Sequence, residues 1–284
     1  HPRNELVVTG LSHPHIETES RQVQSTDSIQ AGNMKLIIVG ASGFVATELI
    51  SQALRRPDVT SLVALSRKPV TAPDGENAAK LKSVVISDYG EYPDDVKKEL
   101  AGANACIWYE SFSQLQSLPP AMTYGTVGIT PPNLRKYPFD EVVRICQTNT
   151  LSGMKAFRET NPAPEFRFLY MGDPFEADSE KKPPFMIEYL QMRAETEEKV
   201  LAYARENKFD ACVAKPGFMT GGPFNPLRTV MGLVFRLTPF GTLPVQTVAA
   251  AMLDQAVTGF EKEHLGIEDL KRIGTKAIEE SGKR

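Results

Sequence analysis

The spacing of three small residues, Gly40, Gly43 and Ala46, points more directly to ligand chemistry than any other feature of this sequence. A glycine at the first position permits a tight turn, and a glycine at the second lets the backbone approach a pyrophosphate. A small third residue lets the following helix pack closely against the preceding strand. Unpaired N–H groups and the positive dipole end of that helix would then hold the phosphates. The candidate cofactor-binding residues of this turn are Gly40, Ala41, Ser42, Gly43, Phe44 and Val45.

The elements needed to position such a turn surround it in the sequence. An apolar run at 36–39 predicts a buried strand, and apolar residues at helical spacing between Leu49 and Leu54 predict a helix directly after the turn. A second strand is predicted at Ser61–Leu65. A glycine string of this kind also occurs as an ordinary turn, but the order strand, turn, helix, strand favours a dinucleotide-binding βαβ unit.

The residues after the second strand indicate which dinucleotide is bound. Sites that prefer NAD place a carboxylate there for the ribose 2′-hydroxyl, whereas a 2′-phosphate favours a cation. Here the tip reads Ser66-Arg67-Lys68 and contains no carboxylate. Arg67 can pair with a 2′-phosphate and stack beside the adenine, although both cations also suit a solvated loop. We therefore predict NADP(H) as the cofactor, bound with the help of Arg67 and Lys68.

Composition argues against several other classes of function. The chain has 284 residues, a net charge of −3 and no basic stripe, which is not the charge pattern of nucleic-acid binding. No apolar run approaches the roughly 20 residues of a membrane span. Most of its few histidines lie near the start of the chain, which argues against a histidine base or metal site in the body. Three scattered cysteines, Cys106, Cys146 and Cys212, predict buried thiols of a cytoplasmic protein.

The rest of the sequence predicts one large domain. Residues 1–33 are polar and lack a helical period, so we expect an N-terminal appendage outside the site, followed by a single NAD(P)-binding domain at 34–284. Strands alternate with helices in the second part, which predicts an α/β fold with a doubly wound parallel sheet of the Rossmann type. The further strands are expected at Ser83–Ile86, Asn104–Trp108, Phe166–Met171 and Phe209–Ala214, and the helices at Asp94–Ala101, Phe139–Thr160 and Ile187–Asn207.

Two segments outside this alternation are expected to lie near the substrate. The Pro- and Gly-rich stretch Leu118–Pro138 is long for a loop, and loops of such length are often lids or binding segments. Residues 215–284 should form a small C-terminal substrate segment over the carboxyl ends of the late strands.

The predicted helix Ile187–Asn207 carries Tyr189 and Arg193, which are four residues apart and so share a face. Together with the glycine turn and Pro216-Gly217, this pair resembles an atypical short-chain dehydrogenase/reductase. A closer resemblance is to the Tat-interacting-protein family of NADP-binding oxidoreductases, and it covers nearly everything from Met34 onward. The segments that carry it are YLQMRAETEEKV, KFDACVAKPG, LPVQTVAAAML and KAIEESGK.

The resemblance implies roles for three candidate catalytic residues. In that superfamily a tyrosine gives or takes the proton at the substrate oxygen, which implies this role for Tyr189. A lysine four residues later normally holds the nicotinamide ribose and lowers the pKa of the tyrosine; here Arg193 stands in its place. Arg193 keeps the charge and could favour the tyrosinate, so Arg193→Lys should retain turnover on this interpretation. Met171-Gly172-Asp173 replaces the usual serine pair, and Asp173 either acts on the substrate or forms a simple turn.

Other positions follow from the resemblance less directly. Asp88 lies where family members contact the adenine, and it suits a strand-end turn equally well. Pro216, Gly217 and Phe218 correspond to a segment that borders the nicotinamide. Trp108 and Tyr109 end the fourth strand, where smaller residues usually pass beneath the cofactor, and so they argue against the usual nicotinamide position.

The leading hypothesis is an NADP(H)-dependent short-chain-type reductase or dehydrogenase that acts on a carbonyl or alcohol of a small organic molecule. In it Tyr189 is the acid–base group and Arg193 its electrostatic partner. Apolar residues near Phe218, Phe224, Val234, Phe235 and Phe240 would favour a lipophilic substrate, or they belong to the core. Two alternatives stay open: a non-catalytic NADP(H)-binding sensor or interaction protein, and a redox-neutral isomerase, lyase or cyclase on the same fold.

Overall fold

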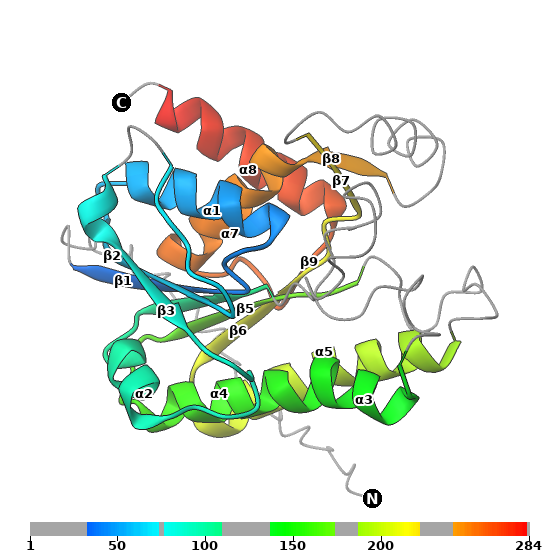
Figure 1. The fold of residues 1–284 in the computed structure, drawn as a ribbon. Helices are drawn as coiled ribbons and strands as arrows, with labels where there is room; N and C mark the ends of the chain where they lie inside the picture. Colours follow the sequence, from blue (N-terminus) through cyan, green and yellow to red (C-terminus); the bar gives the residue numbers. More distant parts are fainter. Residues whose placement is uncertain (1–32, 74–76, 110–136, 174–186, 222–240, 283–284) are drawn as a thin grey trace, which may run out of the picture. The chain divides into compact units, whose positions relative to one another are not determined.

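A seven-stranded sheet lies between two layers of helices in the computed structural model of this chain (Figure 1). The structure describes residues 33–73, 77–109, 137–173, 187–221 and 241–282. Most of the predicted appendage and most of Leu118–Pro138 lie outside these ranges. No helix in the described ranges combines the length and the apolar character that a membrane crossing requires.

The sheet has the strand order β3-β2-β1-β4-β5-β6-β9, and every neighbouring pair is parallel. This order and direction confirm the predicted Rossmann-like α/β fold. The strands are β1 (Met34–Val39), β2 (Val59–Ser66), β3 (Leu81–Val85), β4 (Ala105–Trp108), β5 (Arg167–Met171), β6 (Asp210–Ala214) and β9 (His264–Leu265).

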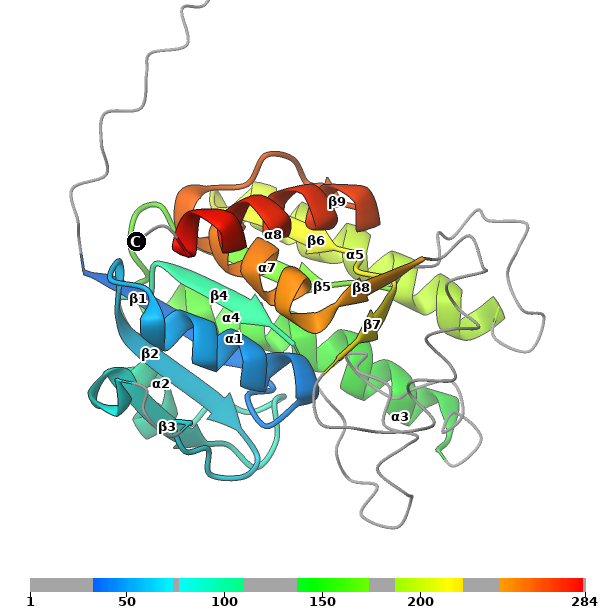
Figure 2. The ribbon, with the colours of Figure 1, turned by 90° about the horizontal axis from the view of Figure 1, so that it is seen from above.

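Helices cover both faces of the sheet (Figures 1 and 2). One layer holds α1 (Phe44–Arg55), α7 (Val245–Thr258) and α8 (Ile267–Ser281). The other holds α2 (Asp94–Leu100), α3 (Phe139–Val143), α4 (Asn149–Glu159) and α5 (Ile187–Asn207). A π-helical turn, Arg144–Thr148, joins α3 to α4, so the helix predicted at Phe139–Thr160 is present but locally wider than an α-helix.

Two small elements complete the described chain. A single 3₁₀ turn, Ala78–Lys80, precedes β3. Strand β7 (Phe218–Thr220) pairs with β8 (Thr242–Pro244) in a separate two-stranded sheet. Since β7 follows β6 after three residues, this small sheet begins beyond the carboxyl end of β6. Part of the segment 215–284 completes the main fold: β9 extends the large sheet, and α7 and α8 lie in the same helix layer as α1. A substrate-side role for this segment stays a prediction.

The strands end in register, which brings several predicted residues to one edge of the sheet. Val39 pairs with Leu65 of β2 on one side and with Trp108 of β4 on the other. The central strands are buried on both faces, as expected for near-continuous apolar runs in a parallel sheet. All three cysteines are buried, as predicted.

Trp108 fixes the packing of α4 against the sheet. Its side chain is completely buried, and its ring lies 6.1 Å from that of Tyr89 and 5.8 Å from that of Phe168. A Cβ added to Gly153 of α4 would lie 2.2 Å from the Trp108 ring atoms Cη2 and Cζ3. The helix therefore approaches β4 closely only because residue 153 has no side chain.

We predict that Gly153→Ala destabilises the protein. Because the Trp108 ring is completely buried and packs against Tyr89 and Phe168, it has little room to withdraw from the added methyl group. Overpacking of this kind costs about 1–3 kcal/mol, more than alanine gains in helix propensity. Chemical denaturation of both variants measures the effect, with Gly282→Ala as the control, since its Cβ meets nothing closer than 3.7 Å. Equal free energies of unfolding for the two variants would contradict the close approach.

Candidate functional site

The glycine turn has a backbone conformation that favours glycine. Gly40 has a φ of 74°, in the left-handed region. The N–H groups of Gly40 and Ala41 donate to the carbonyl oxygen of Leu65 at 3.0 and 3.2 Å. Helix α1 then begins at Phe44, with Gly43 in extended conformation as its N-cap and no side-chain hydrogen bond at the cap. The start of α1 is therefore not closed by a capping side chain.

The turn lies where the winding of the sheet reverses. Strand β1 has β2 on one side and β4 on the other, and α1, which follows β1, covers one face of the sheet. The helices that follow β4 in the chain, α3 and α4, lie on the opposite face (Figure 1). Dinucleotides bind beside such a switch point, outside the carboxyl ends of the strands. The predicted phosphate turn is thus at the place where this fold binds dinucleotides.

The tip of β2 is joined to the glycine turn by the two hydrogen bonds on Leu65. At the last residue of the strand, the Ser66 hydroxyl donates to the carbonyl oxygen of Lys68 and so turns the chain. Arg67 is half-buried and Lys68 is exposed. Both predicted cations therefore follow within three residues of the carbonyl that holds the turn.

Asp88 lies shortly after β3, and its carboxylate contacts other protein groups. One oxygen, Oδ1, accepts hydrogen bonds from the Gly90 N–H at 2.7 Å and from Asn149 Nδ2 at 3.3 Å. The other, Oδ2, accepts from Arg144 Nη1 at 2.9 Å. Burial raises the pKa of this carboxyl, but the hydrogen bonds and the Arg144 charge lower it overall. The Gly90 contact is that of a strand-end turn, whereas the contacts with Arg144 and Asn149 join this turn to the π turn and α4. An adenine contact stays a prediction.

The Trp108 side chain is part of the core. Its indole packs into the core beside α4, as described above, and Tyr109 is also completely buried in the main core. The bulk of these residues is therefore used for packing in the core, and their effect on the position of a nicotinamide stays a prediction.

The three predicted catalytic residues converge at the carboxyl end of β5. Tyr189 and Arg193 are 2 % and 1 % exposed on α5, and Asp173, two residues after β5, is 4 % exposed. Arg193 Nε donates to Asp173 Oδ2 at 2.5 Å, and Arg193 Nη2 donates to the Met171 carbonyl at 3.3 Å. Asp173 is thus more than a turn residue, because this buried ion pair fastens the end of β5 to α5.

Tyr189 is held as a neutral phenol. Burial raises its pKa most, Asp173 raises it further, and Arg193 lowers it; the sum lies well above the ordinary value. Arg193 does act in the direction that favours the tyrosinate, as expected, but burial and Asp173 outweigh its effect on the pKa. The Tyr189 Oη has no hydrogen-bond partner within the described part of the chain.

The geometry also changes the expectation for Arg193→Lys. The guanidinium contacts a carboxylate and a backbone carbonyl at the same time through two nitrogens of one planar group. An ammonium is a compact charge on a flexible stem and cannot reproduce this fork. Arg193 therefore does more than supply charge, and lysine would not replace it without loss of a contact.

Two charged residues near this pair were missed from the sequence. Glu197 Oε1 accepts the backbone N–H of Asp173 at 3.3 Å, and Glu197 Oε2 pairs with Lys215 Nζ at 2.7 Å. Glu197 follows Arg193 by four residues, so the shared helix face was a signal present in the sequence. Lys215 directly follows β6, and its arrival beside Glu197 depends on the pairing of β5 with β6.

Tyr170 of β5 is a further residue that the sequence did not single out. It is completely buried, and Arg193 Cζ lies 5.3 Å from the centre of its ring. Burial raises the pKa of Tyr170, so it too is a neutral phenol. Its hydroxyl has no hydrogen-bond partner among the described residues.

The segment predicted to border the nicotinamide follows Lys215. The Lys215 N–H donates to the Leu265 carbonyl at 2.8 Å, Gly217 has a φ of 70°, and Phe218 begins β7. Pro216, Gly217 and Phe218 thus begin at the sheet edge where Asp173 lies. The other apolar residues considered for a lipophilic lining lie outside the described residues: Phe224, Val234, Phe235 and Phe240.

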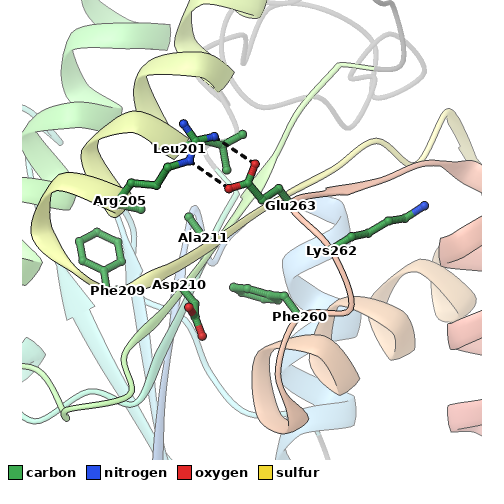
Figure 3. A pocket seen from close by; sticks show the side chains of 9 residues that line it. Leu201, Arg205, Phe209, Asp210, Ala211, Phe260, Lys262 and Glu263 are labelled. Carbon is green, nitrogen blue, oxygen red and sulfur yellow. Dashed lines mark hydrogen bonds and ion pairs between the residues drawn. The ribbon is translucent and has the colours of Figure 1, made fainter. Parts of the chain in front are cut away.

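A pocket of about 240 Å³ lies at the opposite end of β6 (Figure 3). The rings of Phe209 and Phe260 and the ion pair between Arg205 and Glu263 frame it. None of the predicted site residues lines it. This pocket is therefore separate from the cluster at the carboxyl ends of the strands.

Comparison with solved structures finds the same fold at low sequence identity. The enzyme WbmF of Bordetella bronchiseptica, solved with NAD⁺, is 12 % identical, with a TM-score of 0.55 over 89 % of this chain and 79 % of that one. Vestitone reductase of alfalfa is 15 % identical, with a TM-score of 0.54 over 88 % and 99 %. A short-chain dehydrogenase/reductase of Saccharomyces cerevisiae is 14 % identical, with a TM-score of 0.56 over 85 % and 99 %. The chain thus has the Rossmann-like fold of short-chain dehydrogenases/reductases.

Sequence comparison is less extensive. Leucinostatins biosynthesis cluster protein T of Purpureocillium lilacinum is 31 % identical over 72 residues, which is 25 % of this chain. The match spans about a quarter, 26 %, of that protein. No family model matches the chain, and the resemblance to the Tat-interacting-protein family is not confirmed.

We predict that Arg193→Met lowers the free energy of unfolding far more than Arg205→Met. Both arginines lie on α5 and pair with a carboxylate, but the Arg205–Glu263 side chains are 61 % and 51 % exposed. Removing one partner of a buried pair costs about 3–5 kcal/mol, because the other charge stays buried. An exposed pair is worth about 1 kcal/mol or less. Urea denaturation compares the two variants, and Arg193→Lys should fall between them. Similar decreases in the free energy of unfolding at both positions would show that the buried pair stabilises the protein no more than the exposed pair.

Proposed function

We propose that this protein is an NADP(H)-dependent oxidoreductase that acts on a carbonyl or alcohol group of a small organic molecule. The observation that carries the proposal is the convergence of Tyr189, Arg193 and Asp173 at the carboxyl end of β5. The glycine turn lies at the same edge of the sheet, because all strands are parallel and end in register. The partial similarity to a biosynthesis cluster protein supports a small organic substrate.

The residues present fit a dinucleotide. The positive φ of Gly40 and the uncapped start of α1 suit a pyrophosphate, which accepts hydrogen bonds from backbone N–H groups. Residues 40–45 would hold the phosphates, and Arg67 with Lys68 would hold a 2′-phosphate. Pro216, Gly217 and Phe218 would border the nicotinamide, which supplies or accepts the hydride when bound.

Tyr189 would supply the proton in the reductive direction. Reduction of a carbonyl adds a hydride to its carbon and a proton to its oxygen, while the reduced nicotinamide becomes oxidised. Tyr189 is protonated at neutral pH, as an ordinary phenol is, and would donate from Oη to the substrate oxygen; burial raises its pKa and so makes it a weaker acid. The resulting phenolate then takes a proton from water. Oxidation of an alcohol would need the reverse transfer, for which the raised pKa makes Tyr189 a stronger base once ionised.

Arg193 and Asp173 would set the electrostatic environment of the Tyr189 hydroxyl. Their opposite charges act on the Tyr189 pKa in opposite directions, since Asp173 raises it and Arg193 lowers it, so the pair as a whole would stabilise the phenolate less than a lone cation. The Arg193 nitrogen Nη1 has no hydrogen-bond partner among the described residues, and it would be available to a substrate or ribose oxygen. This arrangement would take the place of the lysine and serine of the superfamily that the sequence resembles.

One observation favours a second candidate function, a dinucleotide-binding protein without turnover. Tyr189 is almost completely buried and packs in a small apolar cluster with residues of α3, the π turn and α5. A catalytic phenol must reach the substrate oxygen within hydrogen-bond distance. The two candidates share the cofactor and differ only in whether Tyr189 takes part in a reaction.

We predict that NADPH binds more tightly than NADH and that Arg67→Ala removes this preference. The guanidinium can pair with the 2′-phosphate, which NADH lacks. Isothermal calorimetry with both cofactors measures the effect, and Arg55→Ala is the control, because Arg55 lies at the far end of α1 from the glycine turn. Equal affinities of the unaltered protein for NADPH and NADH would refute the assignment of NADP(H).

We predict that Tyr189→Phe lowers turnover by about 10²- to 10⁴-fold and leaves NADPH affinity unchanged, because only the donated proton is lost. NADPH oxidation against a panel of aldehydes, ketones and quinones is the assay, with Tyr203→Phe on the same helix as the control. Since the pKa of Tyr189 is raised, its ionisation should not lower the reductive rate between about pH 7 and 10.

One outcome would count against the role of Tyr189, and another against the oxidoreductase itself. Unchanged activity in Tyr189→Phe would show that this tyrosine is structural. Tight NADPH binding by the unaltered protein without turnover of any panel member, and without a redox-neutral product, would favour the second candidate function.

A further inference from the structure

Glu197 connects three elements at the site from a single buried carboxylate. It lies on α5, one oxygen accepts the Asp173 N–H after β5, and the other pairs with Lys215 after β6. The side chain is 6 % exposed, whereas that of Lys215 is 19 % exposed. The two strand ends are also joined directly, since the Gly172 N–H donates to the Ala214 carbonyl at 2.9 Å.

The same carboxylate explains why residue 172 is a glycine. A Cβ added at Gly172 would lie 2.5 Å from Glu197 Oε1 and 2.7 Å from Val213 Cγ1. The backbone of Gly172 does not require a positive φ, so the constraint is space. Glu197 thus fills the volume that a side chain at this position would occupy. The absence of a side chain at position 172 is therefore what makes room for the Glu197 carboxylate.

We propose that Glu197 is a positioning residue of the site, which acts by fixing Asp173 for its ion pair with Arg193. The effect on turnover rests on the proposed function, whereas the effect on the ion pair does not. Glu197 is distinct from the three residues assigned to the reaction, and the structure gives it no contact with Tyr189.

The contacts on residues 171–173 carry this proposal. Arg193 holds the carbonyl of Met171 and the carboxylate of Asp173, and Glu197 holds the backbone N–H of Asp173. Three hydrogen bonds from one helix therefore fix the chain as it leaves β5. The Asp173 N–H bond is the only one of the three that does not involve Arg193, so it is the contact that can orient Asp173 independently of the ion pair.

If Glu197 were merely structural, it would stabilise the protein through its ion pair with Lys215 and not through its bond to Asp173. The two roles separate in a pair of double variants, Glu197→Gln/Lys215→Met and Glu197→Met/Lys215→Met. Both variants remove the ion pair without leaving a buried unpaired charge, and glutamine and methionine are similar in size. They differ in one respect: glutamine keeps an oxygen that accepts the Asp173 N–H, and methionine does not. Glu195→Gln, an exposed position on the same helix, is the control.

Two measurements test the proposal. The NMR resonance of the Arg193 Nε–H, assigned with Arg193→Lys, reports the bond to Asp173 without any need for turnover. Steady-state NADPH oxidation gives kcat and KM. We expect the glutamine double variant to keep the resonance and kcat of the unaltered protein. The methionine double variant should shift the resonance towards that of exposed arginines and lower kcat by about 10²-fold, as a misplacement of about 1 Å can do, with KM for NADPH unchanged.

The other outcomes either overturn the proposal for Glu197 or show that the proposed function has failed separately from it. If both double variants behave like the unaltered protein, the bond to Asp173 positions nothing. If both shift the resonance equally, the ion pair with Lys215 is what matters, and the proposal is overturned. If the unaltered protein turns over no panel substrate, the proposed function fails, and the Arg193 resonance alone decides the role of Glu197.

Discussion

The site depends on one buried ion pair, between Arg193 of α5 and Asp173 after β5. A guanidinium removed from water is costly unless a counter-charge and further acceptors surround it. Asp173 and the Met171 carbonyl provide these, and the aromatic ring of Tyr170 lies beside the guanidinium. The pair therefore requires α5 and the end of β5 to stay in one relative position. Tyr189, one helical turn before Arg193, is placed by the same requirement.

The pair also sets the electrostatics around Tyr189. A lone cation four residues away would stabilise a phenolate, which is the role of lysine in the resembled superfamily. Asp173 cancels that effect here, and burial then keeps the phenol neutral. The neutral phenol is the form that would donate a proton in the proposed reduction of a carbonyl. The protonation of Tyr189 thus follows first from burial, and Asp173 adds to it against the effect of Arg193.

The departures from the resembled superfamily are connected in space. Arginine in place of lysine needs a buried carboxylate, which Asp173 supplies two residues after β5. Asp173 is held in turn by Glu197, and the Glu197 carboxylate leaves no room for a side chain at Gly172. A serine at Gly172 would have to displace that carboxylate. Single replacements that restore the usual residues would therefore disturb their neighbours, and the altered residues act as one group.

The sequence by itself determined the alternation of strands and helices, the glycine turn and its place after β1, because these depend on local periodicity and on a backbone angle that favours glycine at Gly40. It did not reveal β9, since two residues carry no pattern. The ion pair joins residues 20 apart and the Glu197 contact residues 24 apart, so both arise only when α5 packs against β5. The protonation of Tyr189 was also decided by tertiary structure, because burial and the position of Asp173 outweigh the neighbouring cation that the sequence shows. Local signals specify elements, whereas the charge balance of a buried site depends on which elements meet.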